Sequence, residues 1–151
     1  MGNIVARLAA HAVIGLDTPV FIYHLEAHPD YLSLTQSIFS GIEAGQWQAV
    51  ISTITLMEIA VQPWQMGRED IARKYEALLV HFPNLHIIPI DRVVARRAAK
   101  LRAQFHLRPP DVLQVAACLL HGAQAFVTND RRLEKLGSLL DIVVLDDFIE
   151  G

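Results

Sequence analysis

Cysteine is nearly absent from this sequence: Cys118 is the only one in 151 residues. A single thiol cannot build an intramolecular disulfide framework or a zinc site made of several cysteines. Cys118 lies within an apolar stretch with a helical pattern, which favours a small core side chain over a reactive group.

Long hydrophobic runs are also missing, since no stretch reaches the roughly 18 apolar residues that a membrane helix needs. The apolar stretch Leu8–Leu16 follows Arg7, as a signal peptide would, but it is short and contains His11. It continues into Asp17 without a small-residue cleavage site. We therefore expect no signal peptide, no membrane span and a cytoplasmic location.

Positive charge is in short supply, because 13 Lys and Arg stand against 16 Asp and Glu, for a formal net charge of −3. This balance lacks the overall basic excess of a non-specific nucleic-acid binder. Acids that hold a cation would be neutralised by it, so a nucleic-acid substrate is compatible with this composition if basic residues are concentrated locally.

Two familiar motifs are absent as well. Gly41, Gly45 and Gly67 fit neither the dinucleotide-binding nor the P-loop spacing. His24 and His28 are four residues apart, but the Glu between them is not at the zinc-protease position, and Pro29 ends the helix at His28.

The chain is rich in apolar residues, at 52% of the sequence with a mean hydropathy of +0.30. Short apolar runs alternate with helical patterns, which predicts βαβ units. The expected strands are 12–16, 47–52, 85–90, 125–127 and 142–145. The expected helices are 18–28, 31–43, 55–62, 67–82, 91–105, 109–120 and a short one ending at 136. We expect an α/β fold, a three-layer α/β/α sandwich around a central parallel sheet of about five strands, in one domain over residues 1–151.

The helix boundaries rest on capping residues and prolines. Thr18 suits an N-cap and Pro19 the first helical position, whereas Pro63 should stop the helix that begins at Thr55.

Four acidic residues lie where an apolar run meets the start of a helical pattern. They form what we call the acidic quartet: Asp17, Glu58, Asp111 and Asp130. If the runs are parallel strands, these side chains converge at the carboxyl edge of one sheet, where open α/β folds place their active sites. Two unit charges about 4 Å apart repel by roughly 4 kcal/mol at an effective dielectric of about 20. A hard divalent cation such as Mg²⁺ or Mn²⁺ relieves that repulsion, so the quartet indicates metal-assisted phosphodiester hydrolysis.

Each acid also has a structural alternative as a helix cap. Asp91 occupies the same kind of junction and cannot be separated from the quartet by spacing. Glu58 lies three residues after Thr55, which is the capping-box spacing, and Asp111 lies in a first helical turn, where the helix dipole favours a carboxylate. Thr18, Thr128 and Asn129 adjoin the acids and could hold a carboxylate or a water in place.

The pattern as a whole resembles the PIN domain family. The resemblance is carried by Leu16-Asp17-Thr18, Thr55-Leu56-Met57-Glu58, Pro110-Asp111-Val112-Leu113-Gln114, Val127-Thr128-Asn129-Asp130 and the closing Val144-Leu145-Asp146-Asp147-Phe148. It implies a Mg²⁺- or Mn²⁺-dependent ribonuclease similar to VapC-type toxins of toxin–antitoxin pairs, with a homodimer and a cognate antitoxin that blocks the acidic cleft.

Carried over by position, the quartet supplies the metal ligands, Thr128 supports them, and Asp91 reverts to a helix cap. Two positions depart from the family pattern. Pro19 stands where a polar residue is common, and Val112 stands where a small residue is common. Neither change removes a ligand.

Basic and aromatic residues suggest contact surfaces. Arg108, Arg131 and Arg132 lie near the quartet and are candidates for phosphate contacts, whereas the basic helix 92–102 is expected to be a solvated face. Trp64 belongs either to the core or to an apolar face for a dimer or an antitoxin.

Other functions remain as alternatives. A non-catalytic PIN-fold module that binds RNA or protein is supported by Pro19. A phosphotransfer receiver would need a lysine at a strand end, but Lys135 lies in a helical pattern. An aspartate-nucleophile phosphatase would need an acid at position 19.

Overall fold

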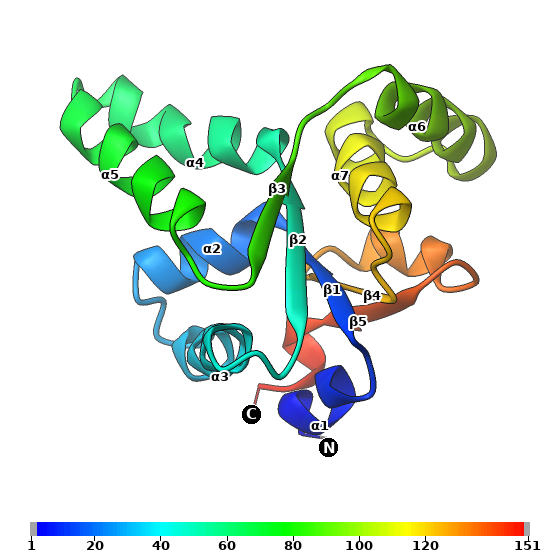
Figure 1. The fold of residues 1–151 in the computed structure, drawn as a ribbon, viewed down its shortest axis with the longest axis horizontal. Helices are drawn as coiled ribbons and strands as arrows, with labels where there is room; N and C mark the ends of the chain where they lie inside the picture. The colour runs from blue at the N-terminus through cyan, green and yellow to red at the C-terminus, as the bar shows by residue number, and fades with distance from the viewer. Residues whose placement is uncertain (1–2, 150–151) are drawn as a thin grey trace.

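A five-stranded parallel sheet forms the centre of the molecule, with the strand order β3-β2-β1-β4-β5 (Figure 1). The structure, a computed structural model, describes residues 3–149. The strands are β1 (Val13–Leu16), β2 (Gln48–Ser52), β3 (Leu85–Ile88), β4 (Ala125–Thr128) and β5 (Asp141–Val144). The predicted α/β fold with about five parallel strands is therefore confirmed.

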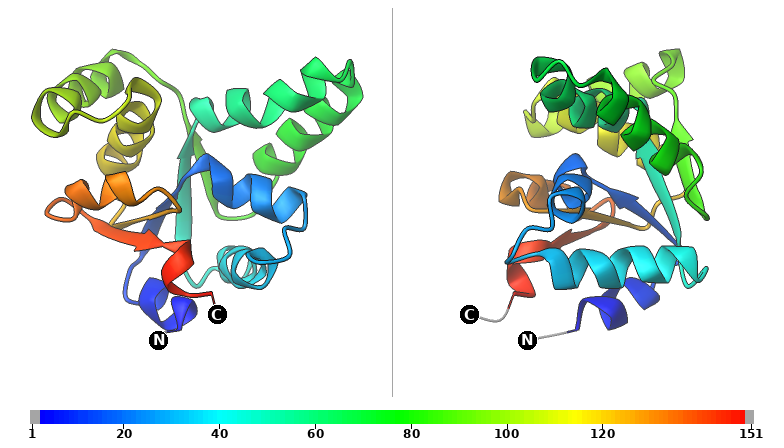
Figure 2. Two further views of the ribbon diagram at one scale, coloured as in Figure 1. Left: turned by 180° about the vertical axis from the view of Figure 1, so that it is seen from behind. Right: turned by 90° about the vertical axis from the view of Figure 1, so that its left-hand side faces the viewer.

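Helices cover both faces of the sheet, as the two views of Figure 2 show. One face carries α1 (Ile4–Ala9), α2 (Thr18–Leu25), α3 (Leu32–Glu43), α4 (Thr53–Gln65) and α5 (Glu69–Val80). The other carries α6 (Arg92–Phe105), α7 (Pro109–Leu120) and the 3₁₀ helix η1 (Arg131–Leu136), and a second 3₁₀ turn, η2 (Leu145–Asp147), follows β5. Each face has its own apolar core, so the sheet is the middle of three layers.

The strand order reverses direction beside β1. From β1 the chain moves outward to β2 and β3 through helices on one face, and then returns through α6 and α7 to place β4 on the other side of β1. Leu16 of β1 pairs with Val127 of β4, so the residues that follow these two strands are neighbours. Ligands of open α/β sheets bind at such a switch point, outside the carboxyl ends of the strands.

Close packing depends on two small residues. A Cβ on Gly15 would lie 2.8 Å from Cys118 Sγ, and a Cβ on Gly41 would lie 2.1 Å from the ring of the buried Trp47. Cys118 is fully buried beneath the sheet, which confirms its prediction as a core residue.

The helix after β2 differs from its prediction at both ends. It begins at Thr53, because the Ser52 hydroxyl caps the Ile54 N–H, and it continues through Pro63 to Gln65. Pro63 lies in the last turn and removes one intrahelical bond there, and the chain leaves the helix at Gly67, which has a φ of +67°. The predicted stop before Pro63 was wrong.

Helix α1 was not predicted. The apolar stretch from Leu8 is divided between helix α1 and strand β1, and the Asn3 side chain caps α1 through the Val5 N–H. The predicted start of α2 was wrong by one residue: Asp17, rather than Thr18, is the N-cap, and Pro19 is the second helical residue. The other boundaries differ from their predictions by a few residues.

No helix within residues 3–149 is both long enough and apolar enough to cross a bilayer.

Candidate functional site

The acidic quartet lines one pocket at the carboxyl edge of the sheet. This pocket of about 390 Å³ has walls from α2, α4 and α7 and is lined by Asp17, Thr18, Pro19, Ile22, Glu58, Val61, Arg108, Asp111 and Asp130. The α4–α5 and α6–α7 helical pairs diverge from one another beyond this edge of the sheet (Figure 1). The structure therefore brings together the four acids that the sequence singled out.

Asp17 is the most buried member of the quartet, with 7% of its surface exposed. Its Oδ2 accepts a hydrogen bond of 2.8 Å from the Thr128 hydroxyl, and its Oδ1 accepts one of 2.9 Å from the Thr18 N–H. The Asp17 pKa is raised from 3.8 to about 6, mainly because the carboxyl is buried; the two hydrogen bonds oppose this rise, and the nearby charges of Asp111 and Glu58 add to it. Within residues 3–149, no Lys, Arg or His side chain forms an ion pair with Asp17.

Glu58 projects from α4, and the Thr18 hydroxyl holds it in place. The Thr18 hydroxyl donates a 2.6 Å hydrogen bond to Glu58 Oε1. The capping-box alternative for Glu58 is wrong, because Ser52 caps α4 and Thr55 is buried inside the helix.

A buried glutamine, Gln114 of α7, orients this part of the site. Its Oε1 accepts hydrogen bonds from the hydroxyls of Ser52 (2.6 Å) and Thr55 (3.1 Å). Because both partners donate to the oxygen, the amide nitrogen must face Thr18, to which it donates at 3.0 Å. The Thr18 oxygen is then an acceptor on that side, so its own proton is directed at Glu58.

Sequence reasoning missed Gln114 and Ser52 as supporting residues. A signal was present, since Gln114 is a polar residue in the middle of the apolar segment 112–120. A buried amide costs free energy unless it is hydrogen-bonded, so such a residue implies a polar partner inside the fold.

Asp111 and Asp130 lie at the rim of the pocket and are paired with arginines. Arg108 Nε donates to Asp111 Oδ2 at 3.1 Å. Arg132 donates to both oxygens of Asp130, from Nε at 3.0 and 3.1 Å and from Nη2 at 2.5 Å. Hydrogen bonding to Arg132 lowers the Asp130 pKa below its ordinary value, and the charge of Arg108 contributes.

The donor set of the pocket suits a hard divalent cation. It offers only oxygen ligands, and a bound cation would compensate the buried charge of Asp17. As the side chains are placed, no three Asp, Glu, His or Cys groups within the described part of the chain converge closely enough to hold an ion. Two of the four carboxylates, Asp111 and Asp130, form ion pairs with Arg108 and Arg132 in this arrangement.

Other residues that the sequence placed near the site lie outside the pocket. Asp91 caps α6 through the Val94 N–H at 2.9 Å, as expected of a helix cap. Arg131 pairs with Asp147 at 2.7 Å and with Glu134. Asn129 bonds to the Asp146 backbone N–H at 3.0 Å, so it supports the η2 turn and not the acids.

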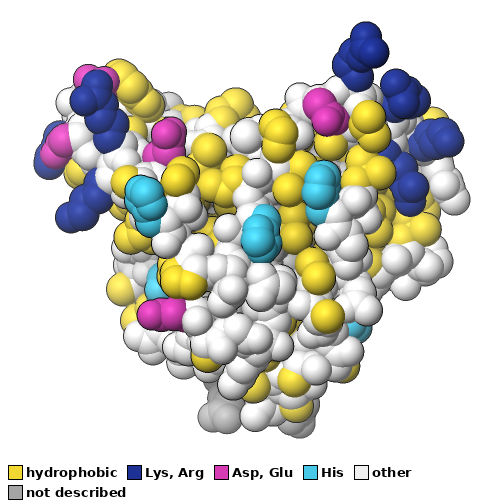
Figure 3. All heavy atoms as spheres, in the orientation of Figure 1, with side chains coloured by type: hydrophobic (Ala, Val, Ile, Leu, Met, Phe, Trp, Pro, Cys, Tyr) yellow, Lys and Arg dark blue, Asp and Glu magenta, His cyan; other side chains and the backbone are white. Residues whose placement is uncertain are grey.

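Lys and Arg side chains gather on the tips of the two helical pairs, over α5 and α6 (Figure 3). Arg92 and Arg96 of α6 are exposed, as expected of a solvated helix face.

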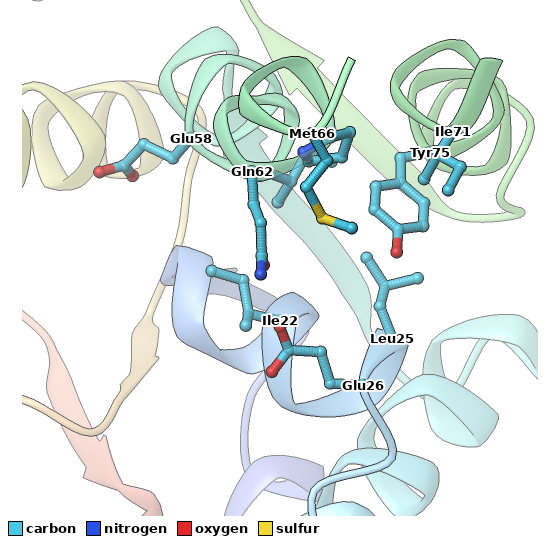
Figure 4. A pocket seen from close by; sticks show the side chains of 10 residues that line it. Ile22, Leu25, Glu26, Glu58, Gln62, Met66, Ile71 and Tyr75 are labelled. Carbon is cyan, nitrogen blue, oxygen red and sulfur yellow. The ribbon is translucent and has the colours of Figure 1, made fainter. Parts of the chain in front are cut away.

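A second, apolar groove adjoins the acidic pocket between α2, α4 and α5. It has a volume of about 250 Å³, and its lining includes Leu25, Met66 and Tyr75. Figure 4 shows Glu58 at one end of this groove, with its side chain directed away from Met66 and Tyr75. Glu58 lines both cavities, so the groove leads to the acids. Trp64 is 58% exposed, which excludes its assignment to the core.

Comparison with solved structures gives the same fold in toxin–antitoxin complexes. A chain of a toxin–antitoxin complex from Klebsiella pneumoniae is 22% identical, with 87% of this chain and 97% of that chain covered and a TM-score of 0.63. A chain of DNA-bound VapBC from Salmonella typhimurium is 20% identical, with 89% and 99% covered and a TM-score of 0.65. A chain of a VapBC complex from nontypeable Haemophilus influenzae is 15% identical, with 89% and 98% covered and a TM-score of 0.66.

No curated protein matches the sequence. The family comparison is positive, because the PIN domain matches residues 14–139, which contain all four acids and Thr128. The chain belongs to the PIN domain family.

Proposed function

We propose that this protein is a divalent-metal-dependent endoribonuclease that hydrolyses RNA phosphodiester bonds with Mg²⁺ or Mn²⁺. The observation that carries the proposal is Asp17, a buried carboxylate without a cationic partner in the described chain, which faces three further acids across one pocket. A protein keeps such a group when a ligand compensates its charge.

The side chains of the site have distinct roles in this proposal. Asp17, Glu58, Asp111 and Asp130 are the metal ligands, some of them through water, because Mg²⁺ retains part of its hydration shell. Thr128 holds Asp17, and Thr18 holds Glu58, so that both acids present their remaining lone pairs to the pocket. A bound ion would supply an activated water and a positive charge opposite the phosphate. Single-stranded or looped RNA is the expected substrate, because its bases are accessible.

The test is incubation of the purified protein with a panel of RNAs in Mn²⁺ or Mg²⁺, with chelator as one control. Asp17→Asn should abolish cleavage. Asp91→Asn is the matched control, because it removes an acid at a similar helix start outside the pocket, and Asn is an equally good N-cap. Cleavage that survives Asp17→Asn or chelator would show that the activity does not come from this site.

We further propose that the protein is a VapC-like toxin that acts as a homodimer and is inhibited by an antitoxin. The similar structures are toxin–antitoxin complexes, and this chain has an apolar groove that leads to Glu58. Helix α4 also exposes Met57, Val61 and Trp64 on one face, a surface suited to a protein partner. Growth arrest that co-expression of the neighbouring gene does not relieve would contradict the toxin proposal. A monomer in light scattering would contradict the dimer.

A non-catalytic module is the second candidate, because two of the four acids are already neutralised by arginines. Its distinguishing result is RNA binding without Mn²⁺ binding or cleavage.

A further inference from the structure

The acids at the pocket rim are engaged by side chains that belong to the same segments of the chain. Asp130 and Arg132 are two residues apart, and the guanidinium of Arg132 covers both carboxylate oxygens. Oδ1 of Asp130 also accepts the Arg132 backbone N–H at 3.0 Å. One residue therefore supplies four hydrogen bonds to this carboxylate and leaves little of it free for another ligand.

Arg108 forms the equivalent pair with Asp111, three residues further along the chain. The two arginines act on the same pair of acids, because the charge of Arg108 also lowers the Asp130 pKa and the charge of Asp111 also raises the Arg132 pKa. Two guanidinium groups and two carboxylates thus form one cluster at the mouth of the pocket.

The partners in these pairs differ in exposure. The side chains of Arg108 and Arg132 are 60% and 56% exposed, whereas those of Asp111 and Asp130 are 11% and 25% exposed. The arginines therefore reach in from solvent on long side chains and can turn outward, but the carboxylates stay at the pocket.

We propose that Arg132 and Arg108 are exchangeable counter-ions of the acidic quartet: they occupy Asp130 and Asp111 when no divalent ion is bound, and metal binding releases them to contact an RNA phosphate. The inference rests on the proposed function. A carboxylate oxygen that accepts from a guanidinium cannot offer the same lone pair to a cation, so the two states exclude each other. The released guanidinium has a planar fork that fits phosphate as well as it fits carboxylate.

This exchange makes metal affinity depend on the two arginines. Because each pair is partly exposed, its removal should strengthen Mn²⁺ binding by about two- to fivefold, the size of effect that such ion pairs have. We expect this gain for Arg132→Gln and for Arg108→Gln in calorimetric titrations with Mn²⁺. Arg132→Lys keeps the charge but loses the fork, so it should give a smaller gain.

Arg131→Gln is the matched control, because it removes the same charge from the neighbouring position, where the side chain pairs with Asp147 and Glu134 outside the pocket. A gain of the same size in Arg131→Gln would show a general electrostatic effect and overturn the exchange. Urea unfolding of each variant in chelator provides the check that the fold is unchanged.

Release can be observed without any chemical step. In wild-type protein labelled with ¹⁵N-arginine, the Nε–H signals of Arg132 and Arg108 should move on Mg²⁺ saturation. Arg68 Nε–H, which bonds to Asp70 outside the lining of the pocket, should not move. Mg²⁺ binding with both signals unchanged would refute the exchange and leave the proposed function intact. Absence of Mn²⁺ binding in the wild type and in all variants would refute both.

Discussion

Asp17→Asn is expected to stabilise the metal-free protein at alkaline pH, although it should destroy the activity. Asp17 is buried, and its pKa is raised from 3.8 to about 6. At a pH between 3.8 and about 6, Asp17 is protonated in the folded state and ionised in the unfolded state. The free energy of unfolding therefore falls as pH rises through this range. Asn is a neutral analogue of the protonated acid and lacks this dependence.

The magnitude follows from the shift in the Asp17 pKa. A rise from 3.8 to about 6 corresponds to about 3 kcal/mol, at about 1.4 kcal/mol per unit. The full difference needs a starting pH well below 3.8, so between about pH 4 and pH 8 the difference in unfolding free energy between Asp17→Asn and wild type should grow by about 2.4 kcal/mol. Saturating Mn²⁺ at the higher pH should stabilise the wild type far more than the variant, because the ion compensates the charge that Asn lacks.

The assay is urea unfolding in chelator at both pH values, followed by circular dichroism and by tryptophan fluorescence. Asp91→Asn is the control, with an expected change within about 0.5 kcal/mol at either pH, because Asn also caps helices. If Asp17→Asn destabilises the protein equally at both pH values, the reasoning from a buried and uncompensated charge is wrong.

Three further predictions concern residues outside the quartet. Gln114→Leu should lower the free energy of unfolding by about 1–3 kcal/mol, because it leaves a buried hydroxyl without an acceptor. Gln114→Leu should also weaken Mn²⁺ binding. Its control is Gln48→Leu, because Gln48 begins β2 and Ser52 ends it on the side of the site; this control should leave the calorimetric Mn²⁺ affinity unchanged. Gly41→Ala should lower the free energy of unfolding by about 1–3 kcal/mol, since its Cβ would overlap the buried ring of Trp47; an unchanged urea midpoint would show that this ring is free to move. Asp141→Asn should cost under about 1 kcal/mol at neutral pH, because its ion pairs are partly exposed. Arg7 and His11 lower the Asp141 pKa below its ordinary 3.8, so the loss should begin to shrink as pH falls below about 4 and should vanish once pH is below the lowered pKa. A loss that stays constant in acid would contradict this origin.

The sheet was predictable because its strands are short apolar runs. The strand Ala125–Thr128, with the sequence AFVT, is buried on both faces, so its apolar residues are continuous and do not alternate with polar ones. The end of α4 was not predictable from Pro63 alone, because the helix continues through this proline to Gln65 and the chain leaves it at Gly67, which has a positive φ. Helix α1 was not predicted, because its last apolar residues and those of β1 follow one another closely within one apolar stretch.

The four acids were predictable as a group from their positions between apolar runs and helical patterns. Asp91 shares that position, and spacing along the chain does not separate it from them, but the strand order does. Asp91 follows β3 at the edge of the sheet, whereas Asp17 and Asp130 follow β1 and β4, which are adjacent. The role of the quartet as metal ligands stays a prediction.

The local sequence by itself determined which segments are strands and helices and which acids stand at their junctions, because periodicity and capping act over a few residues. Tertiary structure alone decided the charge state of Asp17 and the partners of Asp17 and Glu58. Burial raises the Asp17 pKa, Thr128 of β4 donates a hydrogen bond to Asp17, and Gln114 reaches across from α7 to orient Thr18. Desolvation and hydrogen bonding depend on which groups meet in space, and the order of residues along the chain does not specify these contacts locally.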